Sequence, residues 1–205
     1  ENIRALDAHG DIIVWPLKAL CDYIEATGDL AFFDETVPWR RRSDLAATAE
    51  ADTITTHVER LLAMVESRFI PGTYLMRLGE GDWNDALQPA NQKLRETMVS
   101  SWTVALLYQQ LERYIDVLRA AGHSKRASEI ALLAGRMLSD FQRHLIEDDT
   151  VAGYALFYSN GSRELMMHPN DRRTGVKYSL IPMSRGILAD IFSLDLAVDD
   201  RIPAA

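Results

Sequence analysis

A chain of 205 residues with 47% hydrophobic residues is long enough to form one domain with a substantial core. Its formal net charge of −8 argues against binding to nucleic acid or to an anionic membrane surface. The single cysteine excludes an internal disulfide, and the five histidines lack the spacing of metal ligands, so no metal site is expected. The sequence contains neither a run of about 18 apolar residues nor a signal peptide, so we expect a cytoplasmic protein that does not enter a membrane.

Apolar residues recur at helical spacing along most of the chain, and this pattern predicts long helices joined by loops. The expected helices cover residues 12–27, 51–68, 97–121 and 125–146, with a further helix near Pro182 and a shorter one near Leu194. Because only a few residues separate the third and fourth helices, they should form an antiparallel hairpin. Residues 151–158 break the helical pattern and predict a short strand or extended segment, followed by a turn at Asn160-Gly161.

About six or seven helices in pairs indicate an all-α fold built from helical hairpins. A ring of six such hairpins forms an (α/α)6 barrel, but helices of this length leave room for about half of that ring. An open half barrel would expose apolar edges, which a soluble protein rarely tolerates. We therefore expect residues 1–205 to be part of a larger barrel domain, completed by further chain on both sides or by a second copy. The first residue, Glu1, is not a methionine, which agrees with further chain before it.

The segment 79–85, Gly-Glu-Gly-Asp-Trp-Asn-Asp, is the strongest functional signal in the sequence. It places two carboxylates, Asp82 and Asp85, beside the large aromatic ring of Trp83. Cleavage of a glycosidic bond needs a carboxylic acid to protonate the leaving oxygen, and a flat aromatic ring can hold a pyranose. The glycines of the segment allow backbone conformations that are closed to other residues. The alternative is structural, because Asp and Asn are also common in turns and at helix starts.

This segment resembles the catalytic loop of the inverting β-glucoside phosphorylases of glycoside hydrolase family 94. Residues 11–29, with Trp15 and an Ala-Thr-Gly-Asp ending, are similar to a helix of that family, and residues 175–184 resemble a later loop that leads into a barrel helix. Residues 88–91 and 177–180 look closest to the 1,2-β-oligoglucan branch of the family. The resemblance covers most of the chain and implies that it is part of a catalytic (α/α)6 barrel.

The resemblance also implies a reaction. Inorganic phosphate, acting as co-substrate, would cleave a β-1,2- or β-1,4-linked gluco-oligosaccharide with inversion, giving α-glucose 1-phosphate and a shortened sugar. Asp85 matches the family's general acid, and phosphate is already an anion, so neither a general base nor a cofactor is required. The acid must hold its proton near neutral pH, which the negative charge of Asp82 or of bound phosphate would favour. Trp83 would line the sugar subsite, and Asp82 would bind sugar hydroxyls or orient the loop.

Phosphate needs cationic or N–H donors, which the C-terminal part of the chain supplies. The candidates are His168, Arg172, Arg173, Lys177 and Arg185. From their settings in the sequence we select His168, Lys177 and Arg185 as the predicted phosphate-binding residues. The alternative for the first four candidates is that each is an ordinary exposed charge of a loop. Many relatives carry an aromatic residue where this chain has Arg185, so specificity for the donor sugar cannot be transferred.

Two residues near the start of the chain are further candidates for sugar binding. Asp11 and Trp15 are expected to approach the sugar cleft, although a tryptophan at the position of Trp15 also fits a core role. The other two tryptophans, Trp39 and Trp102, are interpreted as core or loop packing.

Two other functions remain open from the sequence. The first is an inverting hydrolase of the same barrel type, which needs a second carboxylate as base, with Glu80 or Glu164 as candidates. The second is a catalytically silent sugar-binding helical module in which the segment 79–85 has a structural role only. The Arg and Asp with which the family grips its donor sugar have no match in this chain. We therefore expect the isolated 205 residues to have little or no activity.

Overall fold

The computed structural model describes residues 9–41, 43–84 and 89–192, and its elements are mainly helical. In chain order these are η1 (Gly10–Ile13), α1 (Trp15–Thr27), η2 (Leu30–Asp34), β1 (Thr36–Arg40), β2 (Ala47–Thr53), α2 (Ile54–Glu66), α3 (Gln92–Thr97), β3 (Met98–Ser100), α4 (Ser101–Ala120), α5 (Ser124–Leu145), β4 (Ile146–Glu147), β5 (Thr150–Val151), β6 (Tyr154–Phe157), β7 (Arg163–Met166) and α6 (Leu180–Leu188), where η marks a short 3-10 helix. The expected acid Asp85 and the short helix expected near Leu194 lie outside the described residues.

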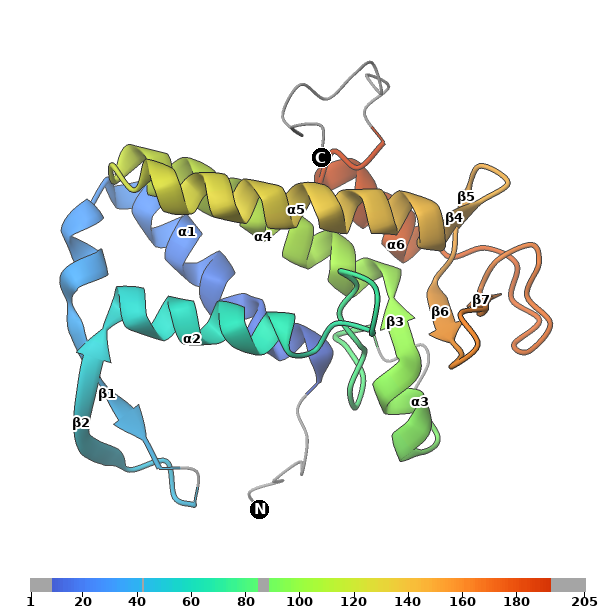
Figure 1. Cartoon of the computed structure of the whole chain (residues 1–205), viewed down its shortest axis with the longest axis horizontal. Helices are drawn as coiled ribbons and strands as arrows, with labels where there is room; N and C mark the ends of the chain where they lie inside the picture. Colours follow the sequence, from blue (N-terminus) through green and yellow to red (C-terminus); the bar gives the residue numbers. More distant parts are fainter. Residues whose placement is uncertain (1–8, 42, 85–88, 193–205) are drawn as a thin grey trace.

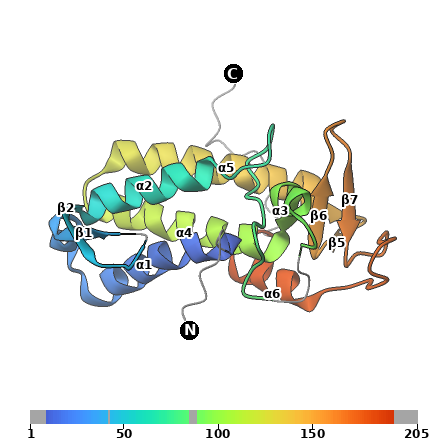
Figure 2. The ribbon, with the colours of Figure 1, turned by 90° about the horizontal axis from the view of Figure 1, so that it is seen from below.

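Helix α4 is the centre of the fold. It packs against α5, α1 and α6, and buried side chains occur along its whole length. Helices α4 and α5 run antiparallel and are joined by a three-residue connection, which confirms the predicted helical hairpin (Figure 1). Seen from below, the β1–β2 hairpin lies at one end of the long helices and strands β6 and β7 lie at the other (Figure 2).

The prediction that the chain is all-α is wrong, because the described residues also form three short antiparallel sheets. Strands β1 and β2 form one sheet, β3, β6 and β7 form a second, and β4 and β5 form a third. The sequence predicted an extended segment at residues 151–158 and a turn at Asn160-Gly161, and these correspond to β5, β6 and the β6–β7 connection. It gave no sign of β1 and β2, which pair with each other and are largely exposed, so neither has a buried apolar face.

Two predicted helices begin later than expected because a strand takes their first residues. The helix predicted at residues 51–68 begins at Ile54, after Thr53, whose side-chain oxygen accepts a hydrogen bond from Thr56 N–H (3.2 Å) and caps the helix. The helix predicted at residues 97–121 begins at Ser101, because Met98–Ser100 pairs with β6. The helices expected at residues 12–27 and 125–146 agree closely with α1 and α5.

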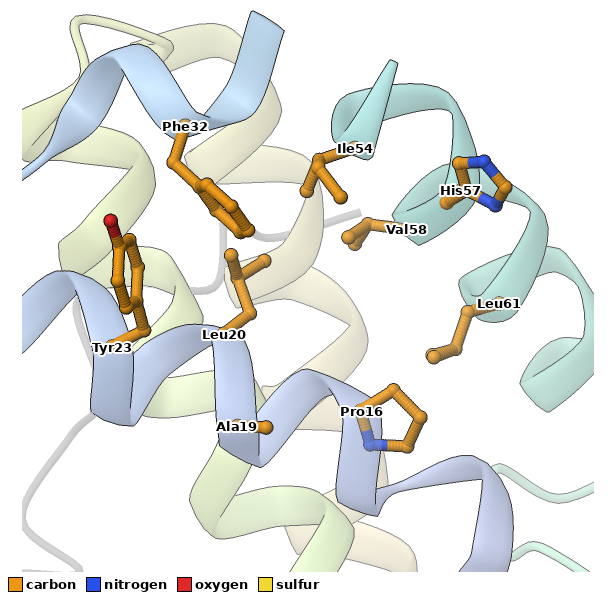
Figure 3. A pocket seen from close by; sticks show the side chains of 9 residues that line it. All are labelled: Pro16, Ala19, Leu20, Tyr23, Phe32, Ile54, His57, Val58 and Leu61. Carbon is orange, nitrogen blue, oxygen red and sulfur yellow. The ribbon is translucent and has the colours of Figure 1, made fainter. Parts of the chain in front are cut away.

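An apolar groove lies between α1 and α2, with η2 along one side. Figure 3 shows side chains from all three elements, including Leu20, Phe32 and Val58, around the same hollow. The groove has a volume of ≈ 520 Å³, and its lining is almost entirely apolar. The full lining consists of Pro16, Ala19, Leu20, Tyr23, Phe32, Ile54, His57, Val58 and Leu61.

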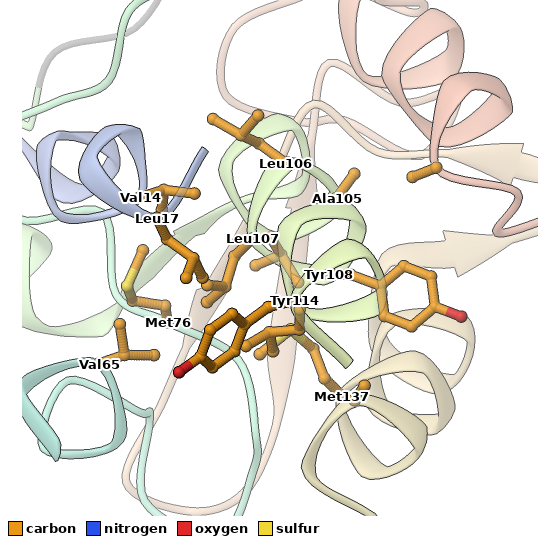
Figure 4. Close-up of a cluster of buried hydrophobic side chains, with 14 of the residues drawn as sticks. Val14, Leu17, Val65, Met76, Ala105, Leu106, Leu107, Tyr108, Tyr114 and Met137 are labelled. Carbon is orange, nitrogen blue, oxygen red and sulfur yellow. The ribbon is translucent and has the colours of Figure 1, made fainter. Parts of the chain in front are cut away.

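The main hydrophobic core joins α4 to its neighbours. Leu107 and Tyr114 of α4 lie close to Leu17 of α1 and Val65 of α2, and Met137 of α5 lies on another side of α4 (Figure 4). All five side chains are buried. Removing a large side chain from such a core typically costs about 2–5 kcal/mol, so the core holds α4 firmly in place. The first turn of this helix contacts the acid loop.

Candidate active site

The acid loop, residues 79–84, lies beside η1 and is fixed by backbone hydrogen bonds. The Gly10 N–H donates to Leu78 O (3.0 Å) and to Gly81 O (2.8 Å). Gly79 has a φ of 64° and Gly81 a φ of 145°, which confirms that the loop uses backbone conformations available mainly to glycine. The predicted acid, Asp85, directly follows this loop in the sequence.

Asp82 is buried within the acid loop, with 2% of its surface exposed. One carboxylate oxygen accepts the Asn84 N–H (3.0 Å), and the other accepts the Thr103 hydroxyl (3.2 Å). Burial raises the pKa of Asp82, hydrogen bonds from Ser100, Thr103 and Asn84 oppose the rise, and the nearby charge of Asp11 adds to it. Of the two roles predicted for Asp82, these contacts favour orienting the loop over contacting sugar hydroxyls.

Three tryptophans form a cluster beside the loop. The ring of Trp83 stacks on the ring of Trp102 with centroids 5.5 Å apart and planes at 24°, and Trp15 lies 6.3 Å from Trp102 on another side. Trp83 is 64% exposed, whereas Trp102 is buried and Trp15 is partly buried. The sequence interpretation of Trp102 as packing is therefore incomplete, because its ring also supports the aromatic ring expected to hold sugar.

Asp11 joins this cluster from η1. Its Oδ2 accepts a hydrogen bond from Trp15 Nε1 (2.9 Å), and its Oδ1 is buried without a hydrogen-bond partner among the described residues. An unsatisfied buried polar atom typically costs about 1–3 kcal/mol, so Oδ1 offers a favourable acceptor for a donor that enters the site. The structure therefore places both Asp11 and Trp15 beside the acid loop.

Arg185 reaches the cluster from α6. Its guanidinium lies 5.4 Å from the centroid of the Trp102 ring, and Nη1 donates to Gln109 Oε1 (2.9 Å). Its Nε is buried and has no hydrogen-bond partner in the described part of the chain, and burial lowers the pKa of the guanidinium. Within the described residues it forms no ion pair with a carboxylate. A partly buried cation without a nearby counter-charge favours the entry of an anion.

The three tryptophans and Arg185 line a hollow of ≈ 440 Å³. Its walls combine three indole rings with one guanidinium and one hydroxyl, a chemistry suited to a sugar ring that carries or neighbours an anionic group. The lining residues are Trp15, Trp83, Trp102, Ile181, Ser184, Arg185 and Leu188.

Comparison with known proteins identifies the family. The sequence model of the Glycosyl hydrolase 94 superfamily catalytic domain matches residues 4–163. The chain belongs to this family. The resemblance inferred from the acid loop and its companion segments is therefore confirmed.

Two phosphorylases are similar in sequence to this chain. A 1,2-beta-oligoglucan phosphorylase from Listeria innocua serovar 6a (strain ATCC BAA-680 / CLIP 11262) is 37% identical over 191 residues, covering 93% of this chain and 17% of that protein. An N,N'-diacetylchitobiose phosphorylase from Vibrio proteolyticus is 23% identical over 143 residues, covering 70% of this chain and 16% of that protein. The chain thus spans about one sixth of the length of these relatives.

His168, a predicted phosphate-binding residue of this family 94 chain, lies in a different loop and is completely buried. Its Nδ1 accepts the Asn170 N–H (3.1 Å), so its Nε2 carries the hydrogen and donates to Glu147 O (2.9 Å). The alternative that His168 is an exposed charge is wrong. Both ring nitrogens bind backbone groups, so the structure gives no support to phosphate binding by His168.

Lys177 lies in the same loop as His168, in residues 167–177. Its ammonium donates to Pro169 O (3.0 Å) and Asp171 O (2.8 Å), which ties two parts of the loop together. The structure thus brings Asp11, Trp15, Asp82, Trp83 and Arg185 into one cluster and gives His168 and Lys177 separate structural contacts.

The two carboxylates considered as bases for a hydrolase both have cationic partners. Glu80 accepts from Arg95 Nη1 (2.6 Å). Glu164, on β7, accepts from Tyr158 Oη (2.6 Å) and Arg173 Nε (2.8 Å), and these hydrogen bonds lower its pKa. Each carboxylate therefore has an ion pair on one of its two oxygens, which favours a structural role.

Two further properties concern the described part of the chain. Among its residues, no group of three or more His, Cys, Asp or Glu side chains is arranged to hold a metal ion. Within the same ranges, no helix combines the length and the apolar character needed to cross a bilayer.

Proposed function

We propose that this chain forms part of the active site of an inverting carbohydrate phosphorylase that acts on β-linked gluco-oligosaccharides. Its membership of family 94 and its 37% identity to a 1,2-beta-oligoglucan phosphorylase support this function and favour the β-1,2 over the β-1,4 linkage. The observation that carries the proposal is the acid loop itself, in which Asp82 is fixed and Trp83, two positions before Asp85 in the sequence, is largely exposed.

In the proposed reaction a phosphate oxygen attacks the anomeric carbon as the bond to the glycosidic oxygen breaks. Asp85 donates its proton to that leaving oxygen, which departs as a hydroxyl of the shortened sugar. The products are α-glucose 1-phosphate, with inverted configuration, and an oligosaccharide one residue shorter. Phosphate supplies the nucleophile, so the chemistry needs one protein carboxyl group as an acid and none as a base.

The cluster around the loop supplies roles for the other residues. The exposed face of Trp83 would stack on a sugar ring, and Asp11 Oδ1, which has no partner among the described residues, would accept a hydrogen bond from a sugar hydroxyl. Trp15 fixes the Asp11 carboxylate through its indole N–H. Arg185, partly buried and without a carboxylate partner in the described ranges, is the phosphate-binding candidate that the geometry supports best.

We also propose that the chain is part of an (α/α)6 barrel completed by the remainder of a longer protein. The apolar groove between α1 and α2 supports this proposal, because a groove of this kind is stabilised when apolar side chains fill it (Figure 3). Its residues come from two helices and a 3-10 helix, so another helix of the barrel is a suitable occupant. A second copy of the chain is the alternative partner.

The test uses the complete protein with β-1,2- and β-1,4-linked gluco-oligosaccharides, with and without phosphate. We expect phosphate-dependent release of glucose 1-phosphate, and a loss of at least about 100-fold in kcat for Asp85→Asn, because amide and carboxyl differ in the proton they can donate. Asp116→Asn, on the exposed side of α4, is the matched control and should keep full activity. Free glucose without phosphate would indicate a hydrolase, and sugar binding without any product would indicate a binding module.

A further inference from the structure

The first turn of α4 contacts the acid loop residue by residue. The hydroxyls of Ser100 and Thr103 both bind the Asp82 carboxylate, and the ring of Trp102 stacks on the ring of Trp83. On the other side of the loop, Tyr154 Oη donates to the carbonyl oxygen of Asn84 (3.3 Å). Three consecutive loop residues, 82 to 84, are therefore each held by a separate contact.

Trp83 depends on Trp102 for its orientation. More than half of the Trp83 surface is exposed, and Trp102 is its aromatic neighbour in the described part of the chain. A stacked aromatic pair contributes an energy that favours one orientation of the ring and leaves its opposite face open. An exposed tryptophan without this support would have to be ordered by the sugar at each binding event, which weakens binding.

Trp102 is itself fixed on several sides. It belongs to the first turn of α4, Trp15 lies against it from α1, and the guanidinium of Arg185 lies over its ring from α6. Its position is therefore determined by three packed helices, while the loop residue that it supports has few other contacts. The arrangement transmits the rigidity of the helices to the aromatic face of Trp83.

We propose that Trp102 and Thr103 are positioning residues for the phosphorylase reaction, an inference that rests on the proposed function. Trp102 sets the orientation of Trp83 for the sugar, and Thr103 sets the conformation of the loop through Asp82. Thr103 is completely buried, and Trp102, although its ring lines the hollow, is 5% exposed and acts in this scheme through the ring of Trp83. Each acts through one loop residue, so the effect of removing either should vanish when its loop partner is already altered.

The first test is a double-mutant cycle in the complete protein. Trp102→Phe should raise the KM for oligosaccharide about 3- to 10-fold, the range expected for a stacked aromatic pair, with the KM for phosphate changed less than about twofold. In a Trp83→Phe background the same substitution should have little further effect. Trp39→Phe, in the β1–β2 hairpin, is the control and should leave both constants unchanged. Additive effects of the two substitutions, or an unchanged KM, would overturn the role of Trp102.

The second test concerns the hydroxyl of Thr103. Thr103→Val removes the hydrogen bond to Asp82 with little change in shape, and we expect kcat to fall about 3- to 10-fold. Thr103→Ser keeps the hydroxyl and should restore kcat to within about twofold. If Val and Ser behave alike, the hydroxyl has no positioning role.

A spectroscopic measurement separates this inference from the proposed function. Stacked indoles at 5.5 Å should give an exciton couplet in the far-ultraviolet circular dichroism spectrum. Trp102→Phe, which removes the indole shared by the pairs with Trp83 and Trp15, should abolish the couplet, and Trp83→Phe should reduce it to the contribution of Trp15 and Trp102. Binding of oligosaccharide, followed by tryptophan fluorescence, should weaken in Trp102→Phe even if no phosphorolysis occurs. Lack of turnover in the wild type would contradict the proposed function alone, whereas a couplet that survives Trp102→Phe would contradict the positioning role.

Discussion

Two buried aspartates organise two loops of this chain, and they differ in the groups that donate to them. Asp171, in the loop 167–177, is 4% exposed and accepts backbone N–H groups on both carboxylate oxygens. Oδ1 accepts from Arg173 N (2.6 Å) and Thr174 N (2.9 Å), and Oδ2 accepts from Met167 N (2.7 Å) and the Thr174 hydroxyl. Burial alone would raise the pKa of Asp171, but these hydrogen bonds together lower it to about 2.

Asp82, in the acid loop, is equally buried but has a raised pKa. It accepts one backbone N–H, from Asn84, and its other contacts are hydroxyls that can either donate or accept. The charge of Asp11 opposes its ionisation. Burial raises the pKa of both carboxylates. In the loop 167–177 the fixed N–H donors outweigh burial and stabilise the anion, whereas in the acid loop one N–H and two hydroxyls do not outweigh it.

Of the substitutions in the two loops, Asp171→Asn should have the largest effect on the free energy of unfolding. Whichever way the amide turns, its NH2 group faces a backbone N–H, because both oxygens of Asp171 accept one. One backbone N–H then loses its acceptor and faces another N–H donor, which should lower the free energy of unfolding by about 2–4 kcal/mol. Urea denaturation measures the change, with Asp116→Asn, an exposed residue, expected to stay within about 0.5 kcal/mol. A loss below about 1 kcal/mol would contradict the assigned hydrogen bonds.

The pH dependence of stability should show the same residue. The folded pKa of Asp171 is about 2 and its ordinary value is 3.8, so the folded state favours the anion. The resulting stabilisation is present above pH about 4 and is lost as the pH falls towards 2, with an upper value of roughly 2 kcal/mol. Unfolding curves of the wild type and Asp171→Asn should therefore converge in this window. Parallel pH profiles would show that the carboxylate is not specially stabilised.

Asp82→Asn should have a smaller effect, below about 1 kcal/mol at neutral pH. The amide oxygen can keep the Asn84 N–H, and the NH2 group can donate to the Thr103 hydroxyl, so no donor is stranded. Because the folded pKa of Asp82 is raised, its contribution to stability is present at low pH and is lost as the pH rises through that pKa. The variant should thus gain stability relative to the wild type with increasing pH. A cost equal to that of Asp171→Asn would remove the distinction between the loops.

The contrast also shows what the sequence could predict. Helices α1, α4 and α5 follow from apolar residues at helical spacing, since that pattern requires a buried face whatever the partner. The acid loop was recognised from residues that are adjacent in the sequence. By contrast, the stacking of Trp83 on Trp102 joins residues 19 positions apart. Apolar residues at helical spacing from Trp102, such as Val99 and Leu106, make it look like ordinary core.

The roles of residues in the loop 167–177 could not be predicted for a related reason. His168 bonds to the carbonyl of Glu147, 21 positions away, so its structural role depends on a contact that no local pattern reveals. Asp171 is not among the predicted site residues, although an Asp followed by Thr three positions later is a local signal for hydrogen bonding to backbone N–H groups. The cationic residues around it suggested phosphate, whereas the ammonium of Lys177 is directed at two carbonyl oxygens.

The last comparison tests the predicted phosphate binding by Lys177. Lys177→Met keeps the length and apolar stem of the side chain but removes its bonds to Pro169 O and Asp171 O, and should cost about 1 kcal/mol in stability. If Lys177 acts within the loop alone, the KM for phosphate in the complete protein should change less than about twofold. Arg185→Met is the matched comparison, because its guanidinium faces the tryptophan cluster and should raise that KM about tenfold or more. An equal rise in both variants would mean that the loop 167–177 also reaches phosphate, and the two loops would then share one site.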